Sequence, residues 1–406
     1  MPHPDADAGA AAPTGGSGRS PAELERRVSA ALGGVTDPEI RRSLPELDMI
    51  ESVTADESGR VRVVVRLTIV GCPASDRIER DVRTAAESVA GAGNADVELT
   101  VMTPAQRNAL TERLRAGRPR GNPFGPGTLT RVIAITSGKG GVGKSTITAN
   151  LAVALAARGL AVGLVDADVH GFSIPALLGL VDADGTPAKP TRVDEMILPP
   201  VAHGVKTISI GMFIEPTEPG QRASSVAVAW RGPMLHRTLS QFLTDVYFGD
   251  LDVLLVDLPP GTGDIAISLG QLLPNAEVVV VTTPQPAAAD VAERSGVVAR
   301  QTGQRLIGVV ENMAGLAGPD GTVLELFGSG GGAEVARRLS EGQDAPVPLL
   351  ASVPLSVALR EGGDAGDPVV HAAPDDPAAR AIEQLAGELA ARPRNLAGRR
   401  LDVSLR

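Results

Sequence analysis

Residues 137–146, which read SGKGGVGKST, match the pattern G-x-x-x-x-G-K-[ST] of a phosphate-binding loop. Glycines in such a loop let backbone N–H groups converge on phosphate oxygens, at a helix N-terminus whose partial positive charge favours anions. Lys144 would reach the β- and γ-phosphates, and the Ser145 hydroxyl would bind Mg²⁺. The residues expected around the phosphates are Gly138, Lys139, Gly140, Gly141, Val142, Gly143, Lys144, Ser145 and Thr146.

Polar side chains also follow three other predicted strands. They are Asp166-Ala167-Asp168 after 161–165, Asp257 after 252–256 and Asn312 after 305–310. Ligands of open α/β sheets bind at the carboxyl ends of strands. Asp166 and Asp168 could orient an attacking water and contact Mg²⁺ through its water shell, and Asp257 suits the acid on the Mg²⁺ side. A single Asp at a strand end is more often a helix cap or turn residue, but together behind a phosphate loop these residues indicate nucleotide hydrolysis.

The elements that must position these residues alternate between strand and helix. A β-branched strand at 132–136 precedes the loop and a helix at 144–158 follows it, which disfavours a chance match in a glycine-rich chain. Further apolar runs lie at 161–165, 252–256, 276–282, 305–310 and 347–350. Such runs are typical of parallel strands buried on both faces, so we expect an α/β fold with helices on both sides of the sheet. Residues 181–230 read as an insertion or irregular connection.

The chain before this region predicts a second, smaller domain. Residues 21–110 contain a helix from Pro21, a strand at 61–69, a helix at 75–89 and a strand at 96–102, which make a small α+β domain. Arg, Pro and Gly dominate 111–129, which we interpret as an exposed linker, or as a docking surface. The nucleotide-binding domain would then span 130–392. We expect disordered tails at 1–20 and 393–406, although the second, which is basic, could touch a membrane or partner.

The amino-acid composition limits the kinds of partner that the protein could bind. A net charge of −10 argues against general nucleic-acid binding, and the apolar runs are too short for a stable membrane association. The single cysteine, Cys72, excludes an intrachain disulfide, so the cytoplasm is the expected compartment. Cys72 reads either as a small core residue or as a thiol site that binds or exchanges a ligand.

Lys139 is a second lysine, which a basic phosphate loop does not need; it could simply be a solvated loop residue. The stretch KGGVGKST at 139–146 resembles the deviant phosphate loop of the MinD/ParA/nitrogenase-iron-protein class. The resemblance implies a SIMIBI/MinD-like P-loop NTPase and a homodimer in which Lys139 reaches the partner's nucleotide. It also implies that Asp168 positions the hydrolytic water, Asp257 is the Walker B acid and Asn312 contacts adenine.

Within that class the chain is most similar to the Mrp/ApbC family of iron–sulfur cluster carrier ATPases. The resemblance rests on residues 165–179, 256–264, 327–332, 353–356 and 360–370. Residues 21–110 are similar to the MIP18-like domain of iron–sulfur assembly proteins. The resemblance implies slow hydrolysis of ATP with Mg²⁺ and delivery of clusters to apoproteins, with help from assembly factors.

One departure from that family concerns the cluster ligands. The family usually has a Cys-x-x-Cys pair after its Glu-Asn-Met segment, and two pairs in a dimer supply the four thiolates of a [4Fe–4S] cluster. Here the corresponding positions are Gly318 and Gly321. An ATP-driven dimeric switch or scaffold without a cluster is therefore the alternative function. A nitrogenase-type reductase would need the same missing thiolates.

Overall fold

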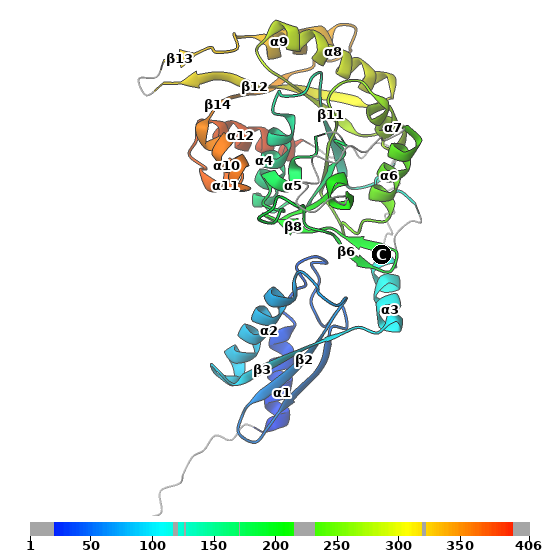
Figure 1. The fold of residues 1–406 in the computed structure, drawn as a ribbon, viewed down its shortest axis with the longest axis vertical. Helices are drawn as coiled ribbons and strands as arrows, with labels where there is room; N and C mark the ends of the chain where they lie inside the picture. The colour runs from blue at the N-terminus through cyan, green and yellow to red at the C-terminus, as the bar shows by residue number, and fades with distance from the viewer. Residues whose placement is uncertain are drawn as a thin grey trace, which may run out of the picture. The chain divides into compact units, whose positions relative to one another are not determined.

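The computed structural model describes residues 20–116, 121–125, 127–169, 171–214, 232–318 and 322–392. The chain divides into an N-terminal unit, Met1–Gln106, and a C-terminal unit, Arg107–Arg406. Figure 1 shows the helices and strands of each unit. The expected tails lie outside the described residues, except for Ser20, whose hydroxyl accepts a hydrogen bond from the Glu23 backbone and caps the first helix.

The N-terminal unit is a small α+β domain, as predicted. Its elements are α1 (Pro21–Leu32), β1 (Ile50–Ala55), β2 (Val61–Leu67), α2 (Ser75–Ala90) and β3 (Ala95–Val101). The sheet order is β1-β2-β3, with β1 antiparallel and β3 parallel to β2. Val61, Val63 and Val65 on one face of β2 are fully buried. The sequence does not predict β1, because its residues are only half-buried or exposed and form no apolar run.

The segment expected as a linker at 111–129 begins inside a helix. This helix, α3 (Pro104–Arg115), also spans the expected end of the small domain. Leu110 and Leu114, one turn apart, are buried, so their helical spacing outweighs the Arg- and Gly-rich composition. Phe124 is buried as well, whereas most other described residues of 111–129 are exposed or half-buried, so the role of this segment as a linker stays a prediction.

In the described part of the C-terminal unit, nine strands form one sheet. Its order is β13-β12-β11-β4-β10-β5-β9-β8, and β14 also pairs with β12. The strands are β4 (Arg131–Ser137), β5 (Val162–Asp166), β8 (Val201–Ala202), β9 (Val205–Ser209), β10 (Val253–Asp257), β11 (Glu277–Thr282), β12 (Arg305–Ala317), β13 (Val323–Leu324) and β14 (Leu349–Leu355). Only the two-residue strands β8 and β13 pair antiparallel among these strands. The predicted, mostly parallel sheet is confirmed.

Helices cover both faces of this sheet (Figure 1). One face carries α4 (Lys144–Ala157), α5 (Ile174–Leu177), α10 (Val357–Ala365), α11 (Val369–Ala372) and α12 (Pro377–Ala391); the other carries α6 (Gly232–Thr244), α7 (Asp264–Leu272), α8 (Pro286–Gln301) and α9 (Gly331–Ser340). Successive residues of a strand point to opposite faces. Ile133 accordingly packs with the first set of helices and Ala134 with the second.

The stretch expected to be irregular, 181–230, contributes two strands, β8 and β9, to the main sheet. β9 lies beside β5, and the hairpin of β6 (Thr191–Val193) and β7 (Met196–Leu198) precedes it; the 3₁₀ helix η1 (Ile210–Phe213) follows. Lys206 interrupts the apolar run of β9, which hides the strand in the sequence. Its side chain is nonetheless buried, with Nζ 5.3 Å from the centre of the Tyr247 ring. Residues 215–231 lie outside the described part.

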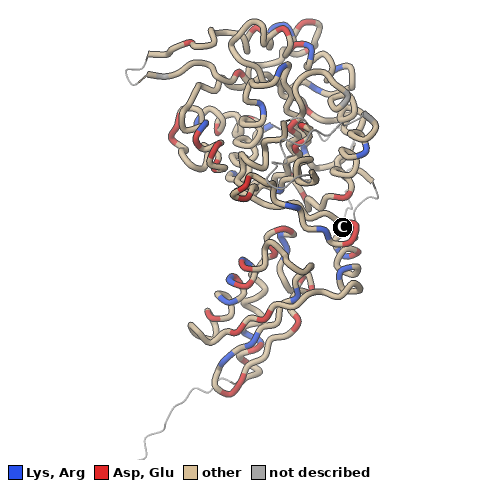
Figure 2. Tube along the Cα trace, viewed as in Figure 1, with Lys and Arg blue, Asp and Glu red and all other residues tan. Residues whose placement is uncertain are grey.

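Acidic and basic residues are interspersed along the described chain, as Figure 2 shows. Arg338, for example, contacts Asp290, Glu293 and Glu334. Much of the basic charge is therefore paired within the protein. Among the described residues, no helix is both long and apolar enough to span a membrane.

Candidate functional site

The phosphate loop connects β4 to α4 at the carboxyl edge of the sheet. Gly143 precedes α4 with a φ of +78°, and a Cβ there would lie 2.2 Å from Nδ2 of Asn312. A Cβ at Gly138 would lie 2.3 Å from the backbone nitrogen of Ala292 in α8. Both positions therefore require glycine, one for its left-handed backbone and both for the close approach of neighbouring groups.

The carboxylate of Asp257, at the end of β10, ties the loop to the sheet. Its Oδ2 lies 2.7 Å from Nζ of Lys144 and accepts a hydrogen bond of 2.5 Å from Oγ of Ser145. Its Oδ1 accepts a hydrogen bond of 2.8 Å from Oγ1 of Thr148 in α4. Asp257 and Lys144 are both buried, where a charge without a partner would be strongly destabilising. The ion pair thus fixes the first turn of α4 against β10.

Asp166 and Asp168 lie beside this ion pair. Asp166 ends β5 directly opposite Asp257 in the parallel register. Its two oxygens accept hydrogen bonds from the Ser209 hydroxyl, at 2.9 Å, and from the Asp168 backbone, at 3.2 Å. Complete burial, and then the negative charge of Asp257, raise the pKa of Asp166 well above its usual range. The Asp168 carboxylate lies 3.9 Å from Nζ of Lys144, so it also faces the loop lysine.

Lys139 contacts a different part of the chain. It is half-buried, and its Nζ donates a hydrogen bond of 3.0 Å to Oε1 of Gln285. Gln285 is the residue before α8. Within one chain, Lys139 is therefore held against the start of α8 and is not a solvated loop lysine.

Two cavities adjoin the loop. One of about 420 Å³ is lined by the loop together with Asp168, Pro259 and Pro260. The other, of about 510 Å³, is lined by Gly143, Thr146, Asn312, Leu355, Ser356, Val357 and Arg360, among others. Asn312 is buried, and its Nδ2 donates a hydrogen bond of 2.9 Å to the Val142 carbonyl. Asn312 therefore lines the second cavity, as expected for a contact with the base, and its side chain also holds the phosphate loop in place.

Sequence reasoning missed the wall of the second cavity that follows β14. The missed residues include Leu355, Ser356 and Val357. A signal was present, because β14 is one more parallel strand and its carboxyl end lies at the same edge of the sheet. Its expected position, 347–350, stops short of the observed end, so the residues that face the cavity were not identified.

Cys72, Gly318 and Gly321 are the residues that bear on a cluster. Cys72 belongs to the N-terminal unit and is buried; burial, with a smaller effect of the Glu39 and Asp37 charges, raises the pKa of its thiol to about 11. The thiolate is thus disfavoured in this conformation. Gly318 follows β12, and its backbone N–H donates to the Thr322 carbonyl at 2.7 Å. Gly321 lies outside the described residues.

The chain matches two family models and many curated proteins. A model described as NUBPL iron-transfer P-loop NTPase matches residues 128–390, and one described as iron-sulfur cluster assembly protein matches residues 25–99. An iron-sulfur cluster carrier protein of Mycobacterium tuberculosis is 52% identical over 389 residues, which cover 95% of this chain and 98% of that protein. Another from Synechocystis is 40% identical over 365 residues and covers 89% and 96%.

A solved nucleotide-binding protein from Archaeoglobus fulgidus, in complex with ADP, is 36% identical. The match covers 58% of this chain and 86% of that chain, with a TM-score of 0.48. The extent of the family-model and curated matches shows that the chain belongs to the NUBPL iron-transfer P-loop NTPase family, here preceded by a domain of the iron–sulfur cluster assembly family.

Proposed function

We propose that the protein binds and hydrolyses ATP at the Asp257 site, and that this cycle drives the transfer of iron–sulfur clusters to apoproteins. The observation that carries the first part is the buried group of Lys144, Ser145 and Asp257 behind the phosphate loop. The second part rests on the relatives named iron-sulfur cluster carrier proteins, which align over almost the whole chain. The single cysteine suits a reducing compartment such as the cytoplasm.

The donor set beside the loop fits Mg²⁺. The Ser145 hydroxyl and the Asp257 carboxylate are 2.5 Å apart, and Asp166 lies opposite Asp257 in the sheet. These are the hard oxygen ligands that Mg²⁺ prefers, directly or through its water shell. Bound there with ATP, the ion would supply charge neutralisation for the β- and γ-phosphates.

We assign the steps of hydrolysis to the residues of this site. The loop backbone and the Lys144 ammonium bind the phosphates. Asp168, whose Oδ1 accepts a hydrogen bond of 3.1 Å from the Gly171 backbone, orients the attacking water. The water oxygen bonds to the γ-phosphorus while the bond from that phosphorus to the β,γ-bridging oxygen breaks. ADP and phosphate are released with the water proton. Asn312 would contact the base from the second cavity.

We further propose that two copies assemble around ATP and that Lys139 serves the partner's nucleotide. The proposal rests on the extra lysine and on its side chain, which needs only to exchange the Gln285 amide oxygen for a phosphate oxygen. A charged contact with the γ-phosphate from a second subunit can supply a large part of the rate of phosphoryl transfer. A chain without its partner would then hydrolyse ATP slowly.

The cysteine content favours a second candidate function. The chain has one cysteine, so a dimer brings two thiols to a [4Fe–4S] cluster that normally has four. Cys72 is also buried and has a raised pKa. An ATP-driven dimeric switch or scaffold that acts on assembly partners would not hold the cluster. It would therefore need neither four thiolates nor an accessible Cys72.

The first prediction concerns Lys144. Lys144→Ala removes the ammonium from the phosphates and from Asp257, and we expect ATP turnover to fall at least about 100-fold. Lys189→Ala is the matched control, because it removes the same charge from an exposed position. Phosphate release under Mg²⁺-ATP measures both variants. Wild-type turnover in Lys144→Ala would remove the proposed ATPase site.

The second prediction concerns Lys139. ATP should convert the wild-type protein to a dimer in light scattering, and Lys139→Ala should remain monomeric with turnover at least about 100-fold lower. Gln285→Ala takes away the partner of Lys139 within the chain but keeps the lysine, so it should dimerise like the wild type. A Lys139→Ala protein that dimerises and hydrolyses ATP normally would contradict the assignment.

The third prediction tests whether the protein binds an iron–sulfur cluster and transfers it. After anaerobic incubation with iron and sulfide, we expect the protein to bind a cluster and pass it to an iron–sulfur apoprotein faster with ATP. Cys72→Ala should lower the bound iron and sulfide, with circular dichroism as the control for folding. An absence of cluster in both proteins would reject the carrier function and favour the switch or scaffold.

A further inference from the structure

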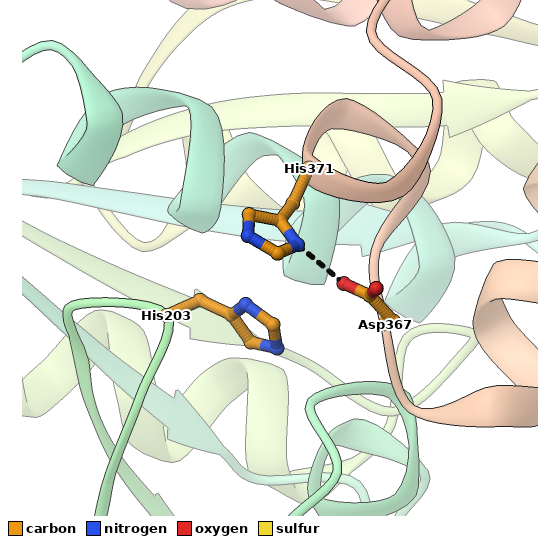
Figure 3. A group of neighbouring side chains, drawn as sticks. All are labelled: His203, Asp367 and His371. Carbon is orange, nitrogen blue, oxygen red and sulfur yellow. Dashed lines mark hydrogen bonds and ion pairs between the residues drawn. The ribbon is translucent and has the colours of Figure 1, made fainter.

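We propose that His203, Asp367 and His371 bind one divalent transition-metal ion, at a site separate from the nucleotide site. Within the described ranges, they form the one group of three or more His, Cys, Asp or Glu residues whose ligand atoms all lie within 4.8 Å of one another. Nδ1 of His371 lies 2.6 Å from Oδ1 of Asp367, and the two imidazole centres are 5.0 Å apart. Figure 3 shows the His203 ring beside that pair.

His203 lies in a tight turn, which fixes the position of its backbone. His203 and Gly204 form the two-residue turn between β8 and β9, with φ values of +46° and +77°. Turns with two positive φ values normally take Asn-Gly or Asp-Gly. Histidine is among the non-glycine residues that adopt a positive φ most often, so the turn can hold His203 at this position. The turn itself does not need an imidazole.

The other two residues are also held by structured backbone. Asp367 and His371 are four residues apart around α11, and the Asp367 N–H donates to the Gly362 carbonyl at 2.9 Å. Val369 and Val370 between them are buried against the core. On the other side, Val205 of β9 is fully buried. The ligands thus project from anchored segments, which lowers the ordering cost of binding an ion.

The donor chemistry selects the class of ion. Two imidazoles and one carboxylate suit Zn²⁺, Co²⁺ or Fe²⁺, whereas Mg²⁺ and Ca²⁺ prefer sites made of oxygen alone. His371 is exposed, with the other two partly so, and an ion can therefore enter from solvent. Three protein ligands also leave a position for water or another donor. Binding would replace the contact between Asp367 and His371 by contacts from both residues to the cation, which then joins the β8–β9 turn to α11.

Co²⁺ is the probe for this site, because its visible spectrum reports nitrogen and oxygen ligands. The full-length protein, washed with EDTA and free of nucleotide, is dialysed against Co²⁺ and then titrated with Zn²⁺. We expect one Co²⁺ per chain, displaced by Zn²⁺, and a higher melting temperature with either ion because they bind the folded state. Failure of the wild-type protein to bind Co²⁺ would overturn the proposal.

Three variants and one control locate the ion. His203→Asn keeps a residue that suits the turn but removes the imidazole, and both it and His371→Ala should lower affinity by more than about 100-fold; Asp367→Asn should lower it at least about tenfold. His236→Ala, in α6, is the control and should bind like the wild type. If His371→Ala fails to fold, His203→Asn decides alone. Wild-type Co²⁺ binding in a folded His203→Asn protein would contradict the proposed site.

Discussion

The ion pair between Lys144 and Asp257 is the interaction on which the candidate site depends. Both groups are buried, and removing one partner of such a pair typically costs about 3–5 kcal/mol, because the other charge is left unpaired in the interior. Asp257 uses both oxygens, binding Lys144 and Ser145 with one and Thr148 with the other. One carboxylate therefore sets the orientation of the loop lysine, of the expected metal ligand and of the first turn of α4. The same residues would hold the phosphates and the ion, so the stability of this corner and its chemistry are coupled.

The order of the strands makes this arrangement possible. β10 lies between β4 and β5, so Asp257 reaches the loop after β4 on one side and is in register with Asp166 on the other. Two adjacent buried carboxylates repel each other, and the raised pKa of Asp166 reflects that repulsion together with burial. A cation near both groups would relieve it. The two carboxylates at the end of the sheet therefore favour binding of a positive charge near Lys144.

The positions of these residues could be predicted from the sequence. The phosphate loop is a local pattern, and the carboxyl ends of parallel strands must meet at one edge, so the sequence alone places Lys144, Asp166 and Asp257 close together. Contacts between distant segments could not be found in this way. Lys139 meets Gln285 and Asn312 meets Val142 across 146 and 170 residues, and no periodic pattern encodes either pair. The strand β9 was not predicted because Lys206 interrupts its apolar residues. The helix α3 was not predicted because Leu110 and Leu114 lie beside or within a segment whose composition is typical of linkers. The group of His203, Asp367 and His371 also depends on the fold, since the turn and α11 are far apart in the chain.

The most direct test of the central claim is the Mg²⁺ dependence of ATP binding in wild type and Asp257→Asn. Asn has almost the same shape as Asp, so the substitution removes the charge with little change in packing. Isothermal titration calorimetry measures the affinity of each protein for ATP with Mg²⁺ and with EDTA. We predict that the wild type binds ATP more tightly with Mg²⁺, and that this difference disappears in Asp257→Asn. An equal Mg²⁺ effect in both proteins, or no binding of ATP to the wild type, would contradict it.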